Sequence, residues 1–312
     1  NPSASHFAME KSLLRERDVV LTGSERFNCV YIFANLLGNE AGRMIYDGDI
    51  IIAQQGRMLA VNRRFSFEKF NLLTCEADLK DVSMSSQLPA VDKKESNEEL
   101  TAAVSLALFD YLRKSRAKGF VLSLSGGADS ATCALMVAEM VRRASHALGL
   151  EKFCHELSLD AALIGSDLKA AVRMLLTCAY QATKNSSRQT FEAARELAGS
   201  TGAEFHHWQI DDEVASYTSK IETALGRKLS WENDDVSLQN IQARARSPVI
   251  WLLANVKKAI LLTTSNRSEA DVGYATMDGD TSGSLAPVAG ITKTFILQWL
   301  QWAEKELGYT SL

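Results

Sequence analysis

Apolar residues follow different patterns on the two sides of a polar segment. Residues 80–99 are rich in Ser, Asp, Glu and Lys and lack apolar periodicity, which predicts a linker. Before the linker, short apolar runs separated by Gly-containing turns predict strands. These runs are residues 28–34, 50–53, 58–61 and 70–74. We therefore expect residues 1–79 to form a mixed sheet that is part of a larger domain.

After the linker, helical and strand patterns alternate. Leu100, Val104, Leu108 and Leu112 recur at helical spacing, and residues 120–124 form a compact apolar run typical of a buried parallel strand. Further strands are predicted at 174–179, 204–210 and 259–264, and further helices at 131–144, 190–198 and 214–225. Repeated strand–helix–strand units predict an α/β fold with a doubly wound parallel sheet.

Composition narrows the classes of function. The 312 residues hold 34 Lys+Arg and 38 Asp+Glu, a formal net charge of −4, so a nucleic-acid partner held by phosphate-backbone contacts is not expected. The longest strictly apolar run, 249–254, is far shorter than the roughly 20 residues of a membrane span. We therefore expect no membrane partner and a cytoplasmic location. Reduced, buried thiols are the expectation for the five cysteines: Cys29, Cys75, Cys133, Cys154 and Cys178.

The strongest chemical signal is the string SGGADS at residues 125–130, between a predicted strand and a predicted helix. Ligands bind at this junction in α/β sheets. Two glycines permit a tight turn whose N–H groups, together with the helix N-terminus, form a site for a polyphosphate. The carboxylate of Asp129 can hold Mg²⁺ that bridges phosphate oxygens. The alternative is a plain turn in which Asp129 or Ser130 caps the helix.

Three downstream segments carry further candidate ligands. NIQARAR, residues 240–246, offers arginines suited to pyrophosphate or carboxylate, and TTSNRSE, residues 263–269, follows a predicted strand and offers Thr264 and Glu269. A third segment combines GDTSGSLAP with ITK, which ends in Lys293. The alternatives are a solvated helix face for the arginines, a helix-capping or surface acid for Glu269, and a surface loop for the third segment.

The SGGxDS loop resembles that of the PP-loop ATP pyrophosphatases, and the four segments in this order closely resemble the glutamine-dependent NAD synthetase family. NPSASHF and residues 35–60 resemble the later part of that family's nitrilase-like glutaminase domain. The resemblance implies an adenine nucleotide alpha-hydrolase-like synthetase domain at residues 100–312, with its C-terminus truncated. A partial nitrilase-like α/β sandwich at residues 1–79 and the linker 80–99 would precede it.

The resemblance implies a ligase of NAD biosynthesis. ATP would adenylate the nicotinate carboxylate of deamido-NAD, and ammonia, released from glutamine in the full-length enzyme, would displace AMP. Mg²⁺ would accompany ATP, and the chain would form a homo-oligomer. The implied ATP site comprises Ser123, Leu124, Ser125, Gly126, Gly127, Ala128, Asp129, Ser130, Thr264 and Lys293. The implied deamido-NAD site comprises Asn240, Arg244, Glu269 and Asp280, with Asp129 and Glu269 as metal ligands and Asp129 and Lys293 as catalytic residues.

Departures from the family leave alternatives open. Ammonia-dependent relatives carry a Lys and an Asp at the positions of Met277 and Ser284, which leaves Asp280 as the acidic candidate there. The family's glutaminase Glu, Lys and Cys lie upstream of Asn1 and its closing loop lies beyond Leu312, so we expect a piece of a longer enzyme. The alternatives are a nucleotide-binding fragment without turnover and another PP-loop amidating enzyme, such as GMP synthetase. Residues 151–167 are an insertion or a lid.

Overall fold

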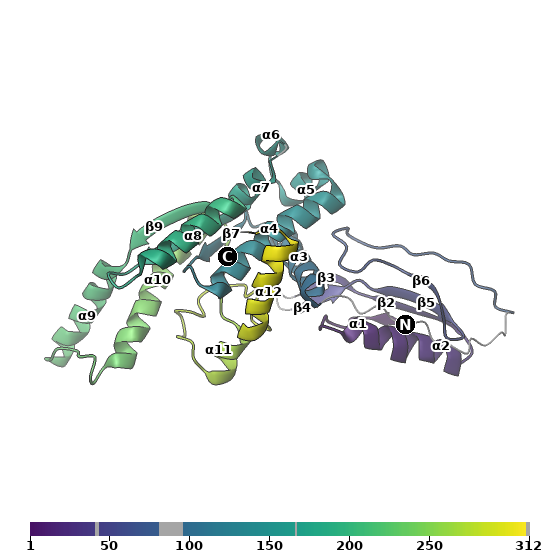
Figure 1. Ribbon diagram of the computed structural model, residues 1–312, viewed down its shortest axis with the longest axis horizontal. Coiled ribbons are helices and arrows are strands. Elements are labelled where there is room, and N and C mark those ends of the chain that lie inside the picture. The colour runs from purple at the N-terminus through teal and green to yellow at the C-terminus, as the bar shows by residue number, and fades with distance from the viewer. Residues whose placement is uncertain (41–43, 81–95, 166, 310–312) are drawn as a thin grey trace. The chain divides into compact units, whose positions relative to one another are not determined.

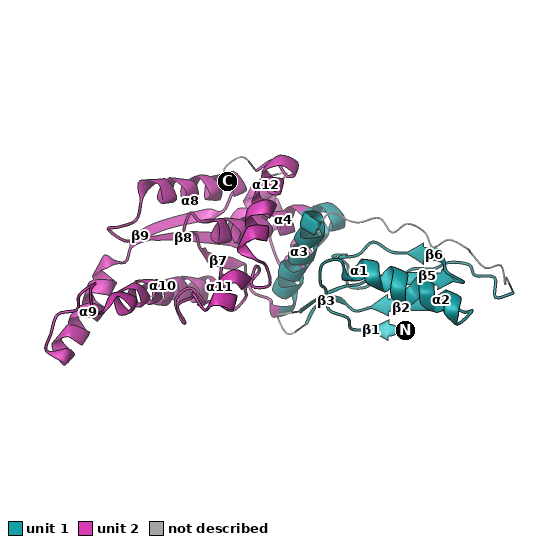
Figure 2. Ribbon diagram, turned by 60° about the horizontal axis from the view of Figure 1, so that its bottom comes forward, with its two compact units in different colours: residues 1–114, 143–153 teal, residues 115–142, 154–312 magenta. Residues whose placement is uncertain are grey.

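The computed structural model describes residues 1–40, 44–80, 96–165 and 167–309 (Figure 1). The chain divides into two compact units (Figure 2). Unit 1 comprises Asn1–Lys114 and Arg143–Phe153, and unit 2 comprises Ser115–Arg142 and Cys154–Leu312. Among the described residues, no helix is long and apolar enough to cross a membrane.

Unit 1 contains the mixed sheet that the sequence predicts. Its order is β1-β2-β5-β6, with β1 parallel to β2 and the other pairs antiparallel. Its strands are β1 (Pro2–Ser3), β2 (Val30–Asn35), β5 (Ile50–Gln54) and β6 (Arg57–Val61), and β3 (Leu37–Glu40) and β4 (Met44–Asp47) form a separate hairpin. One continuous helical stretch consists of α1 (Lys11–Leu14), the π-helical η1 (Arg15–Leu21) and α2 (Thr22–Arg26). Val20 and Leu21 pack from this stretch against Phe33, Ile51 and Ala53, which forms the core.

Two expectations for this unit were wrong. Residues 70–74 form no strand: their backbone pairs with no strand of the described chain, and the side chains of Phe70 and Leu72 are 76% and 82% exposed. The predicted linker 80–99 also overlaps a helix, because α3 (Ser96–Ser115) begins within it, and residues 81–95 lie outside the described residues. Glu98 and Glu99 lie in the first turn of α3, where carboxylates interact favourably with the helix dipole. The polar residues Ser96–Glu99 therefore belong to the first turn of a helix.

Unit 2 contains a parallel four-stranded sheet in the order β10-β7-β8-β9. Its strands are β7 (Phe120–Ser123), β8 (Leu176–Ala182), β9 (Glu204–Gln209) and β10 (Ile260–Leu262). The main helices are α4 (Ala128–Leu148), α8 (Arg188–Thr201), α9 (Asp211–Leu225), α10 (Asp235–Lys257), α11 (Arg267–Val272) and α12 (Lys293–Glu306). The chain passes from β7 to β8 to β9 and then returns to β10 on the other side of β7. Right-handed crossovers therefore place α8 and α10 on opposite faces.

Side chains of adjacent residues in β8 confirm this doubly wound arrangement. Ala179 packs with Ile250 and Ala254 of α10, whereas the ring of Tyr180 contacts that of Phe191 in α8. Successive residues of a strand face opposite sides of the sheet, so α8 and α10 cover different faces, as Figure 2 shows. The predicted α/β fold class is confirmed.

The boundary before β8 differs from the predicted one. Met174 and Leu175 end α7 (Leu168–Leu175), and β8 follows directly, with no Gly or Pro between helix and strand. An apolar run without a turn residue does not reveal where a helix becomes a strand. In the region 151–167, α5 (Leu150–Leu157) and α6 (Ala161–Ile164) are helical, and residue 166 lies outside the described residues.

All five cysteines are free thiols, but they differ in exposure. Cys133, Cys154 and Cys178 are buried, as predicted, and Cys29 is partly buried. Cys75 is exposed, contrary to the prediction, because its apolar neighbourhood forms no strand. Burial raises the pKa of the Cys133 and Cys178 thiols well above the ordinary range, with the charge of Asp129 adding to the effect at Cys133.

We expect iodoacetamide near pH 8 to alkylate Cys75 first and to leave Cys133 and Cys178 unmodified in the folded chain. Cys75 is exposed and accessible to the reagent, whereas Cys133 and Cys178 are buried and burial raises the pKa of their thiols. Peptide mass spectrometry over a time course measures the order of modification. Guanidinium should make all five cysteines reactive, and early modification of Cys178 in native buffer would contradict the fold.

Candidate functional site

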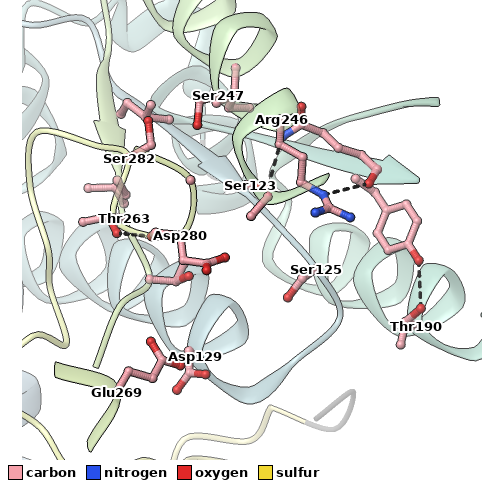
Figure 3. A pocket seen from close by; sticks show the side chains of 18 of the residues that line it. Ser123, Ser125, Asp129, Thr190, Arg246, Ser247, Thr263, Glu269, Asp280 and Ser282 are labelled. Atoms are coloured by element: carbon pink, nitrogen blue, oxygen red, sulfur yellow. Dashed lines mark hydrogen bonds between the residues drawn. The ribbon is translucent and has the colours of Figure 1, made fainter. Parts of the chain in front are cut away.

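A cavity of about 470 Å³ opens where the chain reverses its course in the sheet, at the carboxyl ends of β7, β8 and β10. Figure 3 shows its polar lining. Six residues of the implied ATP, deamido-NAD and metal sites line it: Ser123, Ser125, Asp129, Thr264, Glu269 and Asp280. Such a switch point is the expected place for a ligand in an α/β sheet.

The glycine loop has a fixed conformation of its own. The Ser125 N–H donates to Ser130 Oγ at 3.2 Å, the Gly127 N–H donates to Ser125 Oγ at 3.3 Å, and Ser130 Oγ donates to the Gly127 carbonyl at 3.0 Å. The N–H groups of Ala128, Asp129 and Ser130 begin α4 and precede any carbonyl that this helix can offer. The loop therefore presents a helix N-terminus that suits an anion.

Of the implied loop, Ser123, Ser125 and Asp129 line the cavity, whereas Leu124, Gly126, Gly127, Ala128 and Ser130 do not. Leu124 continues β7. Its side chain is fully buried, and its N–H donates to the Ala179 carbonyl at 2.9 Å. Leu124 therefore continues the strand and does not line the cavity.

Asp129 is the centre of a polar cluster drawn from distant parts of the chain. Its Oδ2 accepts from Lys293 Nζ at 2.5 Å, across 164 residues of sequence, and its Oδ1 accepts from Asn266 Nδ2 at 3.1 Å. Glu269 Oε2 accepts from Ser265 Oγ at 3.3 Å and from the Asn266 N–H at 3.4 Å. Asp129 and Glu269 are thus both hydrogen-bonded to Asn266, which was not among the expected site residues, and Lys293 joins the cluster through Asp129.

Asn266 had a readable sequence signal. It is the N-cap of α11 and forms a capping box with Glu269 three residues later. The N-x-x-E spacing ahead of a helix indicates a cap of this kind. The contact between Asn266 and Asp129 depends on tertiary packing, which the spacing does not reveal.

The carboxylates fit Mg²⁺ that arrives with a phosphate. Mg²⁺ in nucleotide sites takes one or two carboxylates together with phosphate oxygens and water. Asp129 and Glu269 supply that number of ligands, and the described residues contain no cluster of three or more His, Cys, Asp or Glu that could hold a metal. The ammonium of Lys293 lies on Asp129 Oδ2, so a cation bound at this oxygen would take the place of the ammonium. The donor set therefore suits a cation shared with the ligand.

Arg246 contributes a cation to the cavity wall without a carboxylate contact. Its Nε donates to the Gln181 carbonyl at 3.3 Å and its Nη1 to the Gln242 carbonyl at 3.1 Å, and no ion pair joins it to an acid of the described chain. Burial lowers the pKa of Arg246, and the charge of Asp280 partly opposes this effect. A partly desolvated guanidinium of this kind attracts an anionic ligand.

Arg244 and Asn240 do not line the cavity. Arg244 is exposed and donates from Nε to the Met277 carbonyl at 3.0 Å, and Asn240 Oδ1 accepts from Thr276 Oγ1 at 2.9 Å. Residues two positions apart in an α-helix are rotated by about 200° around its axis, so Arg244 and Arg246 point to different sides. Only Arg244 and Asn240 belong to the implied deamido-NAD site. Their implied role in deamido-NAD binding stays a prediction.

The segment after α11 is anchored to β10. Thr263 Oγ1 donates to the Asp280 carbonyl at 2.8 Å, and Asp280 Oδ2 accepts from the Thr276 N–H at 3.0 Å. Met277 and Ser284 are exposed and do not line the cavity. Asp280 is the acid of this segment that lines it.

Replacement of Gly126 by Ala should destabilise the chain by about 2 kcal/mol or more. Gly126 has φ +79, and an added Cβ would lie 2.2 Å from the Thr190 carbonyl oxygen of α8. Gly127→Ala is the matched control, because its Cβ would meet only Ser125 Oγ at 3.4 Å. We expect a cost below about 1 kcal/mol for the control. Urea unfolding followed by circular dichroism measures both, and equal costs would contradict the close approach at Gly126.

The NAD synthase family model matches residues 100–304. The glutamine-dependent NAD(+) synthetase of Macaca fascicularis is 28% identical over 100% of this chain and 52% of its own length, and that of Saccharomyces cerevisiae is 28% identical over 98% and 51%. The chain thus spans about half the length of the curated relatives it matches. A solved glutamine-dependent NAD(+) synthetase from Cytophaga hutchinsonii is 50% identical, with a TM-score of 0.90 over 99% of this chain and 52% of that one.

The structure of glutamine-dependent NAD+ synthetase from Acinetobacter baumannii, in complex with ADP, shares the fold at 23% identity, with a TM-score of 0.73 over 97% of this chain and 50% of that one. The order of the four motifs, their convergence on one cavity and these similarities agree. The chain belongs to the NAD synthase family, and glutamine-dependent NAD(+) synthetases are among its relatives.

Proposed function

We propose that this chain carries the ATP-dependent amidation step of a glutamine-dependent NAD(+) synthetase. In this reaction the nicotinate carboxylate of deamido-NAD is adenylated, and ammonia then converts the adenylate to the amide of NAD. The observation that carries the proposal is the meeting of Asp129, Lys293 and Glu269 beside the helix N-terminus of the glycine loop. Family membership and the relatives' names support the choice of substrates.

The residues of the cavity suit the first half of this reaction. The carboxylate of deamido-NAD attacks the α-phosphorus of ATP, the bond to the bridging oxygen breaks, and pyrophosphate leaves. The ammonium of Lys293, which lies on Asp129, and the N–H groups that begin α4 would stabilise the negative charge on the leaving group. Mg²⁺, held by Asp129 and Glu269, would neutralise phosphate oxygens when bound. No protein nucleophile is needed.

Amidation follows at the carbon of the adenylated carboxylate. Ammonia attacks the acyl carbon of the adenylate, a proton is lost to solvent, and AMP leaves with the former carboxylate oxygen. Glutamine would supply this ammonia in the full-length enzyme. Residues 1–79 would be the later part of the nitrilase-like domain that releases it, and the linker and residues 100–312 would follow. Deamido-NAD contacts from Asn240, Arg244, Glu269 and Asp280, and a homo-oligomeric assembly, belong to the same proposal.

Purified chain supplied with ATP, Mg²⁺, deamido-NAD and ammonium should form NAD, AMP and pyrophosphate in equal amounts. Asp129→Asn should lower the rate by about 100-fold or more, because the site loses a charge that holds the cation and Lys293. Asp271→Asn is the control, since Asp271 is 63% exposed and does not line the cavity. ATP binding without NAD formation would favour a nucleotide-binding fragment, and turnover of xanthosine monophosphate in place of deamido-NAD would favour a GMP synthetase.

Arg246→Met should weaken ATP binding by about tenfold, because the cavity loses its guanidinium. Arg244→Met should change the affinity little, since Arg244 is exposed and contacts only the Met277 carbonyl among the described residues. Isothermal titration calorimetry with ATP and Mg²⁺ measures both constants. Equal losses of ATP affinity in the two variants would contradict a direct contact between Arg246 and the ligand.

A further inference from the structure

Asn266 is hydrogen-bonded to both carboxylates of the site. Its Nδ2 donates to Asp129 Oδ1 at 3.1 Å, its Oδ1 accepts from the Glu269 N–H at 3.1 Å, and its own N–H donates to Glu269 Oε2 at 3.4 Å. The side chain is buried, with 1% exposure. The side-chain amide of Asn266 therefore links the first turn of α4, which carries Asp129, to the start of α11.

The capping box fixes which way the Asn266 amide points. The Glu269 N–H needs an acceptor, so the Asn266 oxygen must face α11 and the NH₂ group must face Asp129. Turning the amide over would place two donors together at the helix and an oxygen against a carboxylate. The local structure of α11 thus sets the direction of the donor that holds Asp129.

The two partners of Asp129 differ in mobility. Lys293 reaches Oδ2 with a long, flexible side chain that is 43% exposed, whereas Asn266 is buried and anchored by its cap. The Lys293 ammonium is therefore the partner that can leave for the phosphates. Without a second donor, the carboxylate would then be free to turn about its Cβ–Cγ bond.

We propose that Asn266 is a positioning residue: it keeps the Asp129 carboxylate directed into the cavity while Lys293 exchanges its place there for a divalent cation. This inference rests on the proposed role of Asp129 as a cation ligand. The exchange involves no covalent step, and one positive partner of Asp129 replaces another.

Binding of Mn²⁺ alone tests the proposal without any turnover. Asn266→Ser keeps an N-cap of similar quality but has no donor that reaches Asp129. We expect its Mn²⁺ affinity, measured by electron paramagnetic resonance of free Mn²⁺ with and without ATP, to fall by about tenfold or more. Lys293→Met removes the competing ammonium and should tighten Mn²⁺ binding in the absence of ATP.

The double variant measures the coupling between the two residues. If Asn266 holds the carboxylate for the incoming cation, the gain from Lys293→Met should shrink in the Asn266→Ser background. An Mn²⁺ affinity of Asn266→Ser equal to that of the parent would overturn the proposal and leave Asn266 as a helix cap. A parent chain that binds no Mn²⁺ in either condition would overturn it as well.

Asn266→Asp provides an independent check, because Asp caps a helix as well as Asn. This substitution places a carboxylate oxygen against Asp129 Oδ1. We expect a lower thermal unfolding midpoint in chelator and recovery in Mn²⁺, and a midpoint unaffected by either would contradict the contact. These readouts do not depend on NAD formation. If the parent chain makes no NAD but shows the expected Mn²⁺ pattern, the proposed function is contradicted and the positioning role of Asn266 is supported.

Discussion

The close approach of the Gly126 backbone to the Thr190 carbonyl is the constraint on which the site depends. It presses the start of α8 against the loop that follows β7, and only a residue without a side chain fits at a positive φ there. With the loop fixed, the first turn of α4 brings the Asp129 side chain to the cavity wall. The rest of the site is arranged around this turn.

Strand order brings the distant residues together. Because β10 lies next to β7, the loop after β10 ends beside the loop after β7, and Asn266 and Glu269 reach the same place as Asp129. Lys293 arrives from the start of α12, where its N–H also donates to Ser268 Oγ at 3.1 Å. The return crossover through α10 has a second effect, because it carries Arg246 to the wall of the same cavity. One reversal of the strand order, from β9 back to β10 beside β7, therefore brings anion donors, carboxylates and a guanidinium together.

Local patterns in the sequence predicted the strand–helix alternation, the glycine loop and the carboxylates, since each depends on residues close in sequence. They failed where tertiary packing decides. Residues 70–74 are apolar enough for a strand but pair with no strand of the described residues. Met174 and Leu175 continue a helix, and no Gly or Pro marks its end. The choice between Arg244 and Arg246 depends on the rotation of α10 relative to the cavity. The sequence indicates that Asn266 is a helix cap, but its contact with Asp129, 137 residues away, depends on tertiary packing.

Cys133 has a consequence for the choice of metal. It lies one turn along α4 from Asp129, but its side chain is fully buried and does not line the cavity. Burial, together with the charge of Asp129, raises the pKa of its thiol. Soft and borderline ions such as Zn²⁺ and Cu²⁺ seek sulfur and imidazole ligands, whereas the cavity offers them carboxylate oxygens, one of which already carries an ammonium. The sulfur of Cys133 is therefore not among the ligands that this cavity would offer to the proposed cation.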